Sequence, residues 1–244
     1  MTLLLLAGTG EARVIAAALA KQGITAIASL AGATRQPAAL AISTRIGGYG
    51  DAAGFRDYLH DTGITAVLDA THPFADRMSH RSAAVAAEMG LPYAQFLRPE
   101  WHPGPGDNWV MLGSEQEAAD HIPLNATVFL ATGRQTLGNF GNLTGRRLFC
   151  RQIDPPEGPF PFPGGEYRIG RPPFSVEDEV ALFRELGIDW LVVKNAGGVA
   201  SRSKLDAARL LELPVAMIRR PAQPDAQRLE TVEQAMRWVR GLPW

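Results

Sequence analysis

Cysteine is almost absent from this chain of 244 residues, since Cys150 is the only one. A single cysteine excludes an internal disulfide and a zinc centre built from several thiolates. The five histidines form no His-x-x-His pair, so we expect no bound metal. Cys150 lies in an apolar run, and we expect a packed thiol rather than a nucleophile.

Long hydrophobic runs and an excess of charge are also missing. No apolar run approaches the roughly 18 residues that a membrane-spanning helix needs. The formal net charge is −1, without the clustered basic excess of a nucleic-acid-binding domain. The apolar start at residues 2–7 has no basic segment before it and predicts a buried strand rather than a signal peptide. We therefore expect a cytoplasmic, monomeric protein that binds a small molecule and neither membrane nor nucleic acid.

The chain does contain a regular alternation of strand-like and helix-like segments. Short apolar runs alternate with segments whose apolar residues recur at helical spacing, which predicts an α/β fold with parallel sheets. Three prolines and two glycines within residues 98–108 indicate a hinge. We expect two Rossmann-like lobes, residues 1–97 and 109–244, with an inter-domain cleft as the ligand site.

The periodicity also predicts individual elements. The expected strands span residues 2–7, 24–30, 45–46, 64–70, 91–97, 127–131, 146–151, 189–194 and 214–218. The expected helices span residues 11–22, 52–62, 76–89, 175–186, 203–211 and 231–240. A further short helix is expected after a capping-box pattern at Ser114 and Glu117. The proline-rich stretch at residues 154–165 is expected to be an irregular loop.

Four of the expected strands end in polar or glycine-containing loops. In open parallel sheets, ligands bind outside the carboxyl ends of the strands. Loops that carry Thr, His, Asn, Arg and Lys at four such ends predict one composite ligand site. These loops are residues 7–13, 69–74, 131–134 and 194–198.

The first loop only partly matches the glycine pattern of a phosphate-binding turn. Gly8 and Gly10 are present, but Arg13 stands at the third glycine position. Backbone N–H groups and the helix dipole favour an anion here, whereas Glu11 should repel a phosphate directly above it. Glu11 therefore either points away or orders the loop. The alternative is an ordinary tight turn between a strand and a helix.

The end of the second strand bears on the choice of cofactor. NAD-binding folds usually carry an acidic residue about 20 positions beyond the glycines, and none is present here. Ser29, Thr34 and Arg35 could instead receive a 2′-phosphate, which favours NADPH over NADH. The alternative is that Arg35 is a solvated loop charge.

The remaining loops supply a histidine and several cations. His72 is fixed just beyond a strand end by Pro73, which suits a ligand site. Arg134, Arg171 and Lys194, with Lys204 further on, provide positive charge for a polyanionic ligand. The Tyr-x-x-x-Lys pair of short-chain dehydrogenases is absent, which counts against that class.

In these motifs the sequence resembles the precorrin-6A reductases of cobalamin biosynthesis. The resemblance rests on Asp69-Ala-Thr-His-Pro-Phe74 together with Lys194-Asn-Ala-Gly-Gly198, and it spans nearly the whole chain. Two departures are visible. Gly32-Ala33-Thr34 replaces the family's Gly-Arg-Thr, and Arg171-Pro172-Pro173-Phe174 replaces its Arg-Gly-Pro-Phe.

The resemblance implies a reductase that delivers hydride from NADPH to a ring double bond of a tetrapyrrole, yielding precorrin-6B. The proton donor is left open between His72, Lys194 and solvent. The expected cofactor-binding residues are Gly8, Thr9, Gly10, Glu11, Ala12, Arg13, Ser29, Thr34, Arg35, Gly48, Tyr49, Gly50, Thr71, His72 and Pro73. The expected substrate-binding residues are Thr132, Arg134, Arg171, Lys194, Asn195, Gly197, Gly198, Ser203 and Lys204.

Three alternatives stay open at this point. The substrate is either metal-free or the cobalt-containing compound of the oxygen-independent route. A second alternative is an NADP-dependent reductase or epimerase of another small metabolite. A third is a dinucleotide sensor without catalytic activity.

Overall fold

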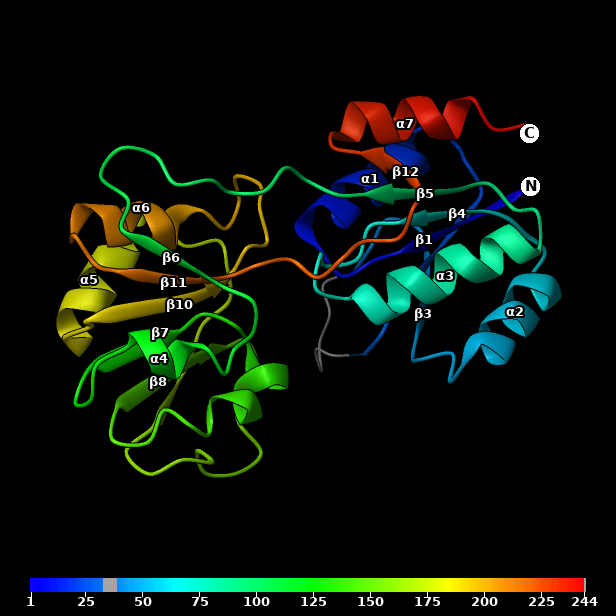
Figure 1. Ribbon diagram of the computed structural model, residues 1–244. Helices are drawn as coiled ribbons and strands as arrows, with labels where there is room; N and C mark the ends of the chain where they lie inside the picture. The colour runs from blue at the N-terminus through cyan, green and yellow to red at the C-terminus, as the bar shows by residue number, and fades with distance from the viewer. Residues whose placement is uncertain (33–38, 244) are drawn as a thin grey trace. The chain divides into compact units, whose positions relative to one another are not determined.

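The computed structural model describes residues 1–32 and 39–243, which form two compact units (Figure 1). The first unit is Met1–Pro99 with the C-terminal segment from Pro221, and the second is Glu100–Arg220. Each unit holds a six-stranded sheet whose neighbouring strands are all parallel. The predicted α/β fold with two parallel sheets is therefore confirmed.

The sheet of the first unit has the strand order β12-β5-β4-β1-β2-β3. Its strands are β1 Thr2–Leu6, β2 Ala26–Leu30, β3 Ser43–Ile46, β4 Ile64–Asp69, β5 Tyr93–Phe96 and β12 Gln227–Leu229. Its helices are α1 Gly10–Lys21, α2 Ala52–Asp61, α3 Asp76–Glu88 and α7 Val232–Arg240.

Helices cover both faces of this sheet, as the continuous apolar run of β1 requires. Successive side chains of a strand point to opposite faces. Leu3 and Leu5 therefore pack into the core with α1 and α7, while Leu4 and Leu6 pack with α2 and α3. Figure 1 shows the two helix pairs on opposite sides of the sheet.

The sheet of the second unit has the order β6-β11-β10-β7-β8-β9. Its strands are β6 Trp109–Leu112, β7 Thr127–Leu130, β8 Arg147–Gln152, β9 Glu166–Ile169, β10 Trp190–Lys194 and β11 Val215–Ile218. Its helices are α4 Ala118–His121, α5 Val176–Leu186 and α6 Ser203–Leu210, with a 3₁₀ segment, η1, at Arg134–Phe140.

Five strands of each sheet share one topology. In the first unit the chain runs outward from β1 through β2 to β3, then returns to place β4 on the other side of β1. In the second unit β7, β8, β9 and β10 repeat this path. The strand order thus reverses beside β1 and β4, and again beside β7 and β10. Ligands bind at such switch points, and the four polar loops of the sequence follow these same four strands.

The unit boundaries differ from the expected lobes. Residues 221–244 were assigned to the second lobe, but β12 pairs with β5 and α7 packs on α1, so this segment completes the first unit. The predicted hinge, residues 98–108, also differs. From Glu100 onward it belongs to the second unit, where Trp101 is only 4% exposed.

Short edge elements were missed, and most of the longer ones were found. The strands β6, β9 and β12 have three or four residues each, and few of their side chains are buried, so no clear alternation marks them. The helices expected to begin at Ser175 and Thr231 are confirmed, and each of these residues is an N-cap with a complete capping box. The one at Ser114 is wrong: α4 starts at Ala118, and the Glu117 carboxylate accepts from Gly113 N–H and the Ser114 hydroxyl instead. No helix in the described part of the chain is long and apolar enough to cross a membrane.

Candidate functional site

The loop between β1 and α1 presents open backbone at the first switch point. Gly8 has φ of +142°, which favours glycine. A Cβ atom at Gly8 or Gly10 would meet nothing within 4 Å, so a ligand can approach the main chain. Thr9 is the N-cap of α1: its Oγ1 accepts from Ala12 N–H at 3.1 Å. The same hydroxyl donates to the Ala70 carbonyl at 2.9 Å and ties the loops after β1 and β4 together.

Glu11 orders this loop through an ion pair. Its Oε2 lies 2.6 Å from Nη1 of Arg98, and the two side chains are 22% and 12% exposed. The guanidinium offsets the negative charge that would otherwise oppose an anion at the start of α1. Arg13, also expected to bind cofactor, lies on the exposed side of α1.

The loop after β4 is fixed by a buried carboxylate. Asp69 is fully buried and accepts from Thr71 N–H at 3.0 Å, from Thr71 Oγ1 at 2.7 Å and from Tyr93 OH at 2.9 Å. Burial, followed by the neighbouring Asp69 carboxylate, raises the pKa of the Tyr93 phenol. Asp69 and Tyr93 therefore set the backbone that leads to His72.

His72 is held in one orientation by its own loop. Its Nδ1 accepts from Phe74 N–H at 3.2 Å. In the neutral ring the proton then sits on Nε2, which makes that nitrogen a hydrogen-bond donor. Protonation of Nδ1 would remove the acceptor of Phe74 N–H.

A pair of glutamines supports the same loop. Gln223 donates from Nε2 to the Pro73 carbonyl at 2.9 Å and to the Pro221 carbonyl at 2.8 Å. Its Oε1 accepts from Nε2 of Gln95 at 2.8 Å. Sequence reasoning missed Gln223, because it lies 128 residues from Gln95 and no motif surrounds it.

The ends of β2 and β3 carry a polar cluster. Ser29, 6% exposed, accepts from Tyr49 OH at 2.8 Å and from Nη1 of Arg45 at 3.2 Å. Burial is the largest influence on the Tyr49 phenol and raises its pKa. Gly48 and Gly50 flank this ring in the sequence, and the Gly48 carbonyl accepts from Arg45. The structure thus brings together Ser29 and Tyr49, two of the expected cofactor residues. The predicted Thr34 and Arg35 lie outside the described residues.

The loop after β7 starts the site of the second unit. Gly133 has φ of +76°, and Arg134 is exposed at the start of η1. The Oγ1 atoms of Thr132 and Thr136 are buried, and neither has a hydrogen-bond partner among the described residues. An unsatisfied buried hydroxyl is costly unless a ligand or water completes it.

The strand β10 ends in a shielded lysine. Nζ of Lys194 lies 3.7 Å from Oε1 of Glu115, and these side chains are 13% and 14% exposed. Burial lowers the pKa of the Lys194 ammonium, while the Glu115 carboxylate acts in the opposite direction. Glu115 lies between β6 and α4, and no sequence motif indicated it.

Asn195, one of the expected substrate residues, has a structural role. It is fully buried, and its amide pairs with the main chain of Trp101. Oδ1 accepts from Trp101 N–H at 2.9 Å, and Nδ2 donates to the Trp101 carbonyl at 3.0 Å. Arg220 donates to the carbonyls of Asn195 and Ala196 at 2.8 and 2.9 Å. The loop is therefore fixed by the segments at both ends of the second unit.

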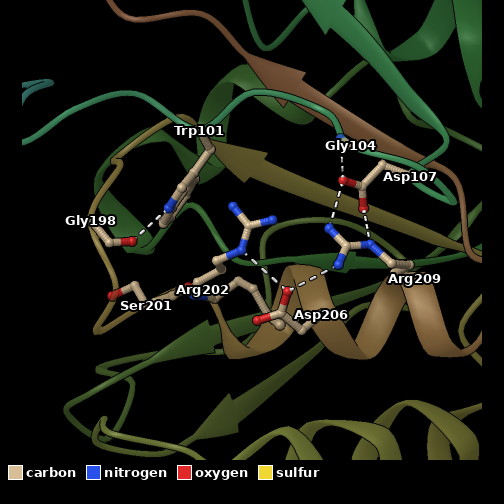
Figure 2. A network of polar contacts seen from close by, with 9 residues as sticks. Trp101, Gly104, Asp107, Gly198, Ser201, Arg202, Asp206 and Arg209 are labelled. Carbon is tan, nitrogen blue, oxygen red and sulfur yellow. Dashed lines mark hydrogen bonds and ion pairs between the residues drawn. The ribbon is translucent and has the colours of Figure 1, made fainter.

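Figure 2 shows how this anchor continues toward α6. The Trp101 indole donates to the Gly198 carbonyl at 2.6 Å. Asp107 accepts from Arg209 at 2.9 and 2.8 Å, and Arg209 also lies near Asp206. Burial of Trp101 and this ion-pair network explain why the proline-rich segment packs on the second unit.

The other expected substrate residues lie on the loop after β10, at the start of α6 and, for Arg171, on the loop between β9 and α5. Gly197 and Gly198 both have positive φ, at 68° and 75°. Ser203 begins α6, and Lys204 donates from Nζ to the Ser201 carbonyl at 2.6 Å. Arg171 is half-exposed and lies 4.0 Å from Asp154. Within residues 1–32 and 39–243, no three His, Cys, Asp or Glu side chains gather as metal ligands would.

Two parallel sheets, each with a reversal of strand order, and an open, N-capped turn after β1 define an α/β protein of the dinucleotide-binding type. Comparison with known families identifies it further. Residues 2–240 match the family described as precorrin-6x reductase CbiJ/CobK, and the chain belongs to that family.

Several relatives align with this chain along almost their whole length. The precorrin-6A reductase of Rhodococcus erythropolis is 43% identical over 240 residues, covering 97% of this chain and 96% of that protein. The precorrin-6A reductase of Rhodobacter capsulatus is 43% identical, covering 97% and 95%. The cobalt-precorrin-6A reductase of Priestia megaterium is 30% identical, covering 90% of each. A solved structure of a CobK precorrin-6A reductase superposes with a TM-score of 0.95 at 42% identity, covering 98% of this chain and 96% of the other.

Proposed function

We propose that this protein is an NADPH-dependent precorrin-6A reductase, which reduces a ring double bond of precorrin-6A to give precorrin-6B. The observation that carries the proposal is the family match over residues 2–240, with its two motif strings on the switch-point loops. The metal-free substrate is favoured over the cobalt form, because a precorrin-6A reductase is 43% identical and a cobalt-precorrin-6A reductase 30%.

The first unit fits a nicotinamide cofactor. The open backbone at Gly8 and Gly10, the capped start of α1 and the neutralised Glu11 suit a pyrophosphate. When bound, the cofactor supplies the hydride. The cofactor residues proposed are Gly8, Thr9, Gly10, Glu11, Ala12, Arg13, Ser29, Thr34, Arg35, Gly48, Tyr49, Gly50, Thr71, His72 and Pro73.

The second unit supplies cations for a carboxylate-bearing tetrapyrrole. Thr132 brings an unsatisfied hydroxyl, and Lys194 brings a shielded ammonium. Asn195 acts by fixing the loop, so its neighbours present the contacts. The substrate residues proposed are Thr132, Arg134, Arg171, Lys194, Gly197, Gly198, Ser203 and Lys204.

The reduction also needs a proton, and two residues hold one at a defined donor atom. His72 carries it on Nε2, because Nδ1 is engaged with the backbone. Lys194 carries it on Nζ, beside Glu115. His72→Asn and Lys194→Met separate them, since loss of the donor lowers kcat more than it changes KM.

The experiment is turnover of metal-free and cobalt-loaded substrate, each with NADPH and with NADH. We expect NADPH to be oxidised with the metal-free macrocycle. If neither macrocycle is reduced, the proposed function fails. NADPH binding without oxidation in the presence of either macrocycle supports the sensor alternative.

Variants test the division between the units. Arg134→Ala and Lys194→Ala should weaken substrate binding more than cofactor binding. If the substrate affinity is unchanged in both variants, Arg134 and Lys194 do not bind the substrate. Arg35→Ala should reduce the preference for NADPH over NADH, and an unaltered preference moves the 2′-phosphate contact away from Arg35.

A further inference from the structure

Arg45 occupies a position that no sequence motif indicated. It lies near the end of β3, and its guanidinium stands over two tyrosine rings, 4.0 Å from the centroid of Tyr49 and 4.9 Å from that of Tyr58. Its Nη1 donates to Ser29 Oγ at 3.2 Å and to the Gly47 carbonyl at 2.8 Å. A planar guanidinium fixed in this way is preorganised for a phosphate.

The charge of Arg45 is not balanced by a carboxylate within the described residues. Every hydrogen-bond partner found for it there is neutral. Two other arginines of the same unit do pair with a carboxylate: Arg98 with Glu11, and Arg56 with Glu88. Residues 33–38, which connect β2 to β3, contain no acidic residue in the sequence. A half-buried cation without a counter-charge favours an anionic ligand.

The place of Arg45 in the sheet fits one part of a dinucleotide. In this fold the end of the second strand reads the ribose next to the adenine, and a nearby arginine accommodates a 2′-phosphate. Ser29 is the penultimate residue of β2, and β2 pairs with β3 so that Ser29 lies opposite Arg45. No acidic residue stands there to accept from a free 2′-hydroxyl.

We propose that Arg45 binds the 2′-phosphate of the cofactor and so sets the preference for NADPH over NADH, with Ser29 and Tyr49 holding its guanidinium in place. This inference rests on the proposed function. It goes beyond it because it adds to Arg35 a second phosphate contact, which lies on β3 and outside the segment after β2.

A purely structural role makes a different prediction. Arg45 also holds the carbonyls of Gly47 and Gly48. If that is its whole role, its removal disturbs the loop and weakens NADPH and NADH by the same factor. The ratio of the two dissociation constants therefore distinguishes recognition of the phosphate from support of the loop.

The experiment measures dissociation constants of NADPH and NADH for the full chain by calorimetry. The variants are Arg45→Met, which removes the charge, and Arg45→Lys, which keeps it. Arg56→Met is the matched control, because it removes one positive charge from the same unit at an exposed pair. Circular dichroism verifies that each variant is folded, and 2′,5′-ADP and 5′-ADP serve as smaller probes of the same phosphate.

In Arg45→Met we expect NADPH to bind about tenfold more weakly or worse, equivalent to ~1.4 kcal/mol, while NADH changes far less. Arg45→Lys should retain part of the preference, and Arg56→Met all of it. High salt should reduce the preference in the wild type but not in Arg45→Met. The pair of ADP probes should repeat this pattern.

The following outcomes overturn the inference. An unchanged NADPH to NADH ratio in Arg45→Met overturns it and leaves the proposed function standing. If both nucleotides also bind more weakly by the same factor, Arg45 is assigned to loop support. If the wild type binds neither nucleotide, the proposed cofactor fails together with this inference. If Arg45→Met does not fold, Arg45→Lys decides: we expect it to keep only part of the preference, and a wholly unaltered ratio there overturns the inference.

Discussion

The ion pair between Arg151 on β8 and Glu179 on α5 gives the sharpest prediction of stability. Its two contacts, Nη1 to Oε1 and Nη2 to Oε2, are both 2.7 Å long. Arg151 is 12% exposed and Glu179 only 1%. The guanidinium also lies between two rings, 4.8 Å from the centroid of Phe129 and 4.2 Å from that of Phe174. The pair thus links the sheet to α5 and to the loop that carries Arg171.

Glu179→Leu leaves the Arg151 charge partly buried without its partner. Removing one member of a buried pair typically costs about 3–5 kcal/mol. At ~1.4 kcal/mol for each factor of ten, the unfolding equilibrium constant changes by about two to three and a half orders of magnitude. Arg151→Met leaves the buried Glu179 carboxylate without its partner and should lower the free energy of unfolding by as much. The double variant should regain most of the loss, because an apolar pair needs no desolvated charges.

The assay is urea unfolding of the four proteins of a double-mutant cycle, followed by circular dichroism. Glu166→Leu is a matched control: Glu166 pairs with Arg147 at 2.8 Å in the same unit, but the side chains are 46% and 56% exposed. We expect the control to stay near the wild-type midpoint. The reasoning is refuted if either single variant lowers the free energy of unfolding by less than about 1 kcal/mol, as loss of an exposed pair does. It is also refuted if the effects of the two single variants simply add in the double variant.

Three further predictions concern the second unit. If Lys194 is the proton donor, activity falls as the pH rises through its pKa. Glu115→Gln removes the carboxylate that raises this pKa, so the alkaline limb of the pH–rate profile should move to lower pH. An unmoved limb would exclude Lys194 as the proton donor. Cys150 is fully buried, which raises its pKa to about 12, so a disulfide reagent should react with it only in denaturant, and rapid reaction of the native protein contradicts this. Asn195→Asp removes the donor to the Trp101 carbonyl and should lower the free energy of unfolding in urea by about 1–3 kcal/mol. The fluorescence of Trp101 should change as well. A wild-type midpoint would contradict the pairing of Asn195 with Trp101.

The sequence was most informative where local chemistry decides the structure. Apolar runs such as residues 2–6 predict strands buried on both faces, and the helix starts at Ser175 and Thr231 depend on capping residues within one turn. The strand ends also followed from the chain alone, because loops after parallel strands lie at one edge of a sheet. The four loops at β1, β4, β7 and β10 were predicted in this way.

Contacts between distant residues could not be predicted. Arg45 and Ser29 are 16 residues apart, Glu11 and Arg98 are 87 apart, and no spacing rule relates either pair. The position of Asn195 in a polar loop at a strand end predicts a ligand contact. Its partner, Trp101, is 94 residues away, so its burial was invisible in the sequence.

The sequence by itself therefore determined the α/β class, the family resemblance and the four polar loops, because propensity, apolar periodicity and capping act over a few neighbouring residues. Only the tertiary structure decided that the segment after Pro221 completes the first sheet, where β12 gains its ladder from β5. It also decided which polar residues are buried in structural hydrogen bonds and which are exposed. Burial and hydrogen bonding depend on what folding brings alongside a residue, and for Asn195 and Arg45 those neighbours come from other strands and loops.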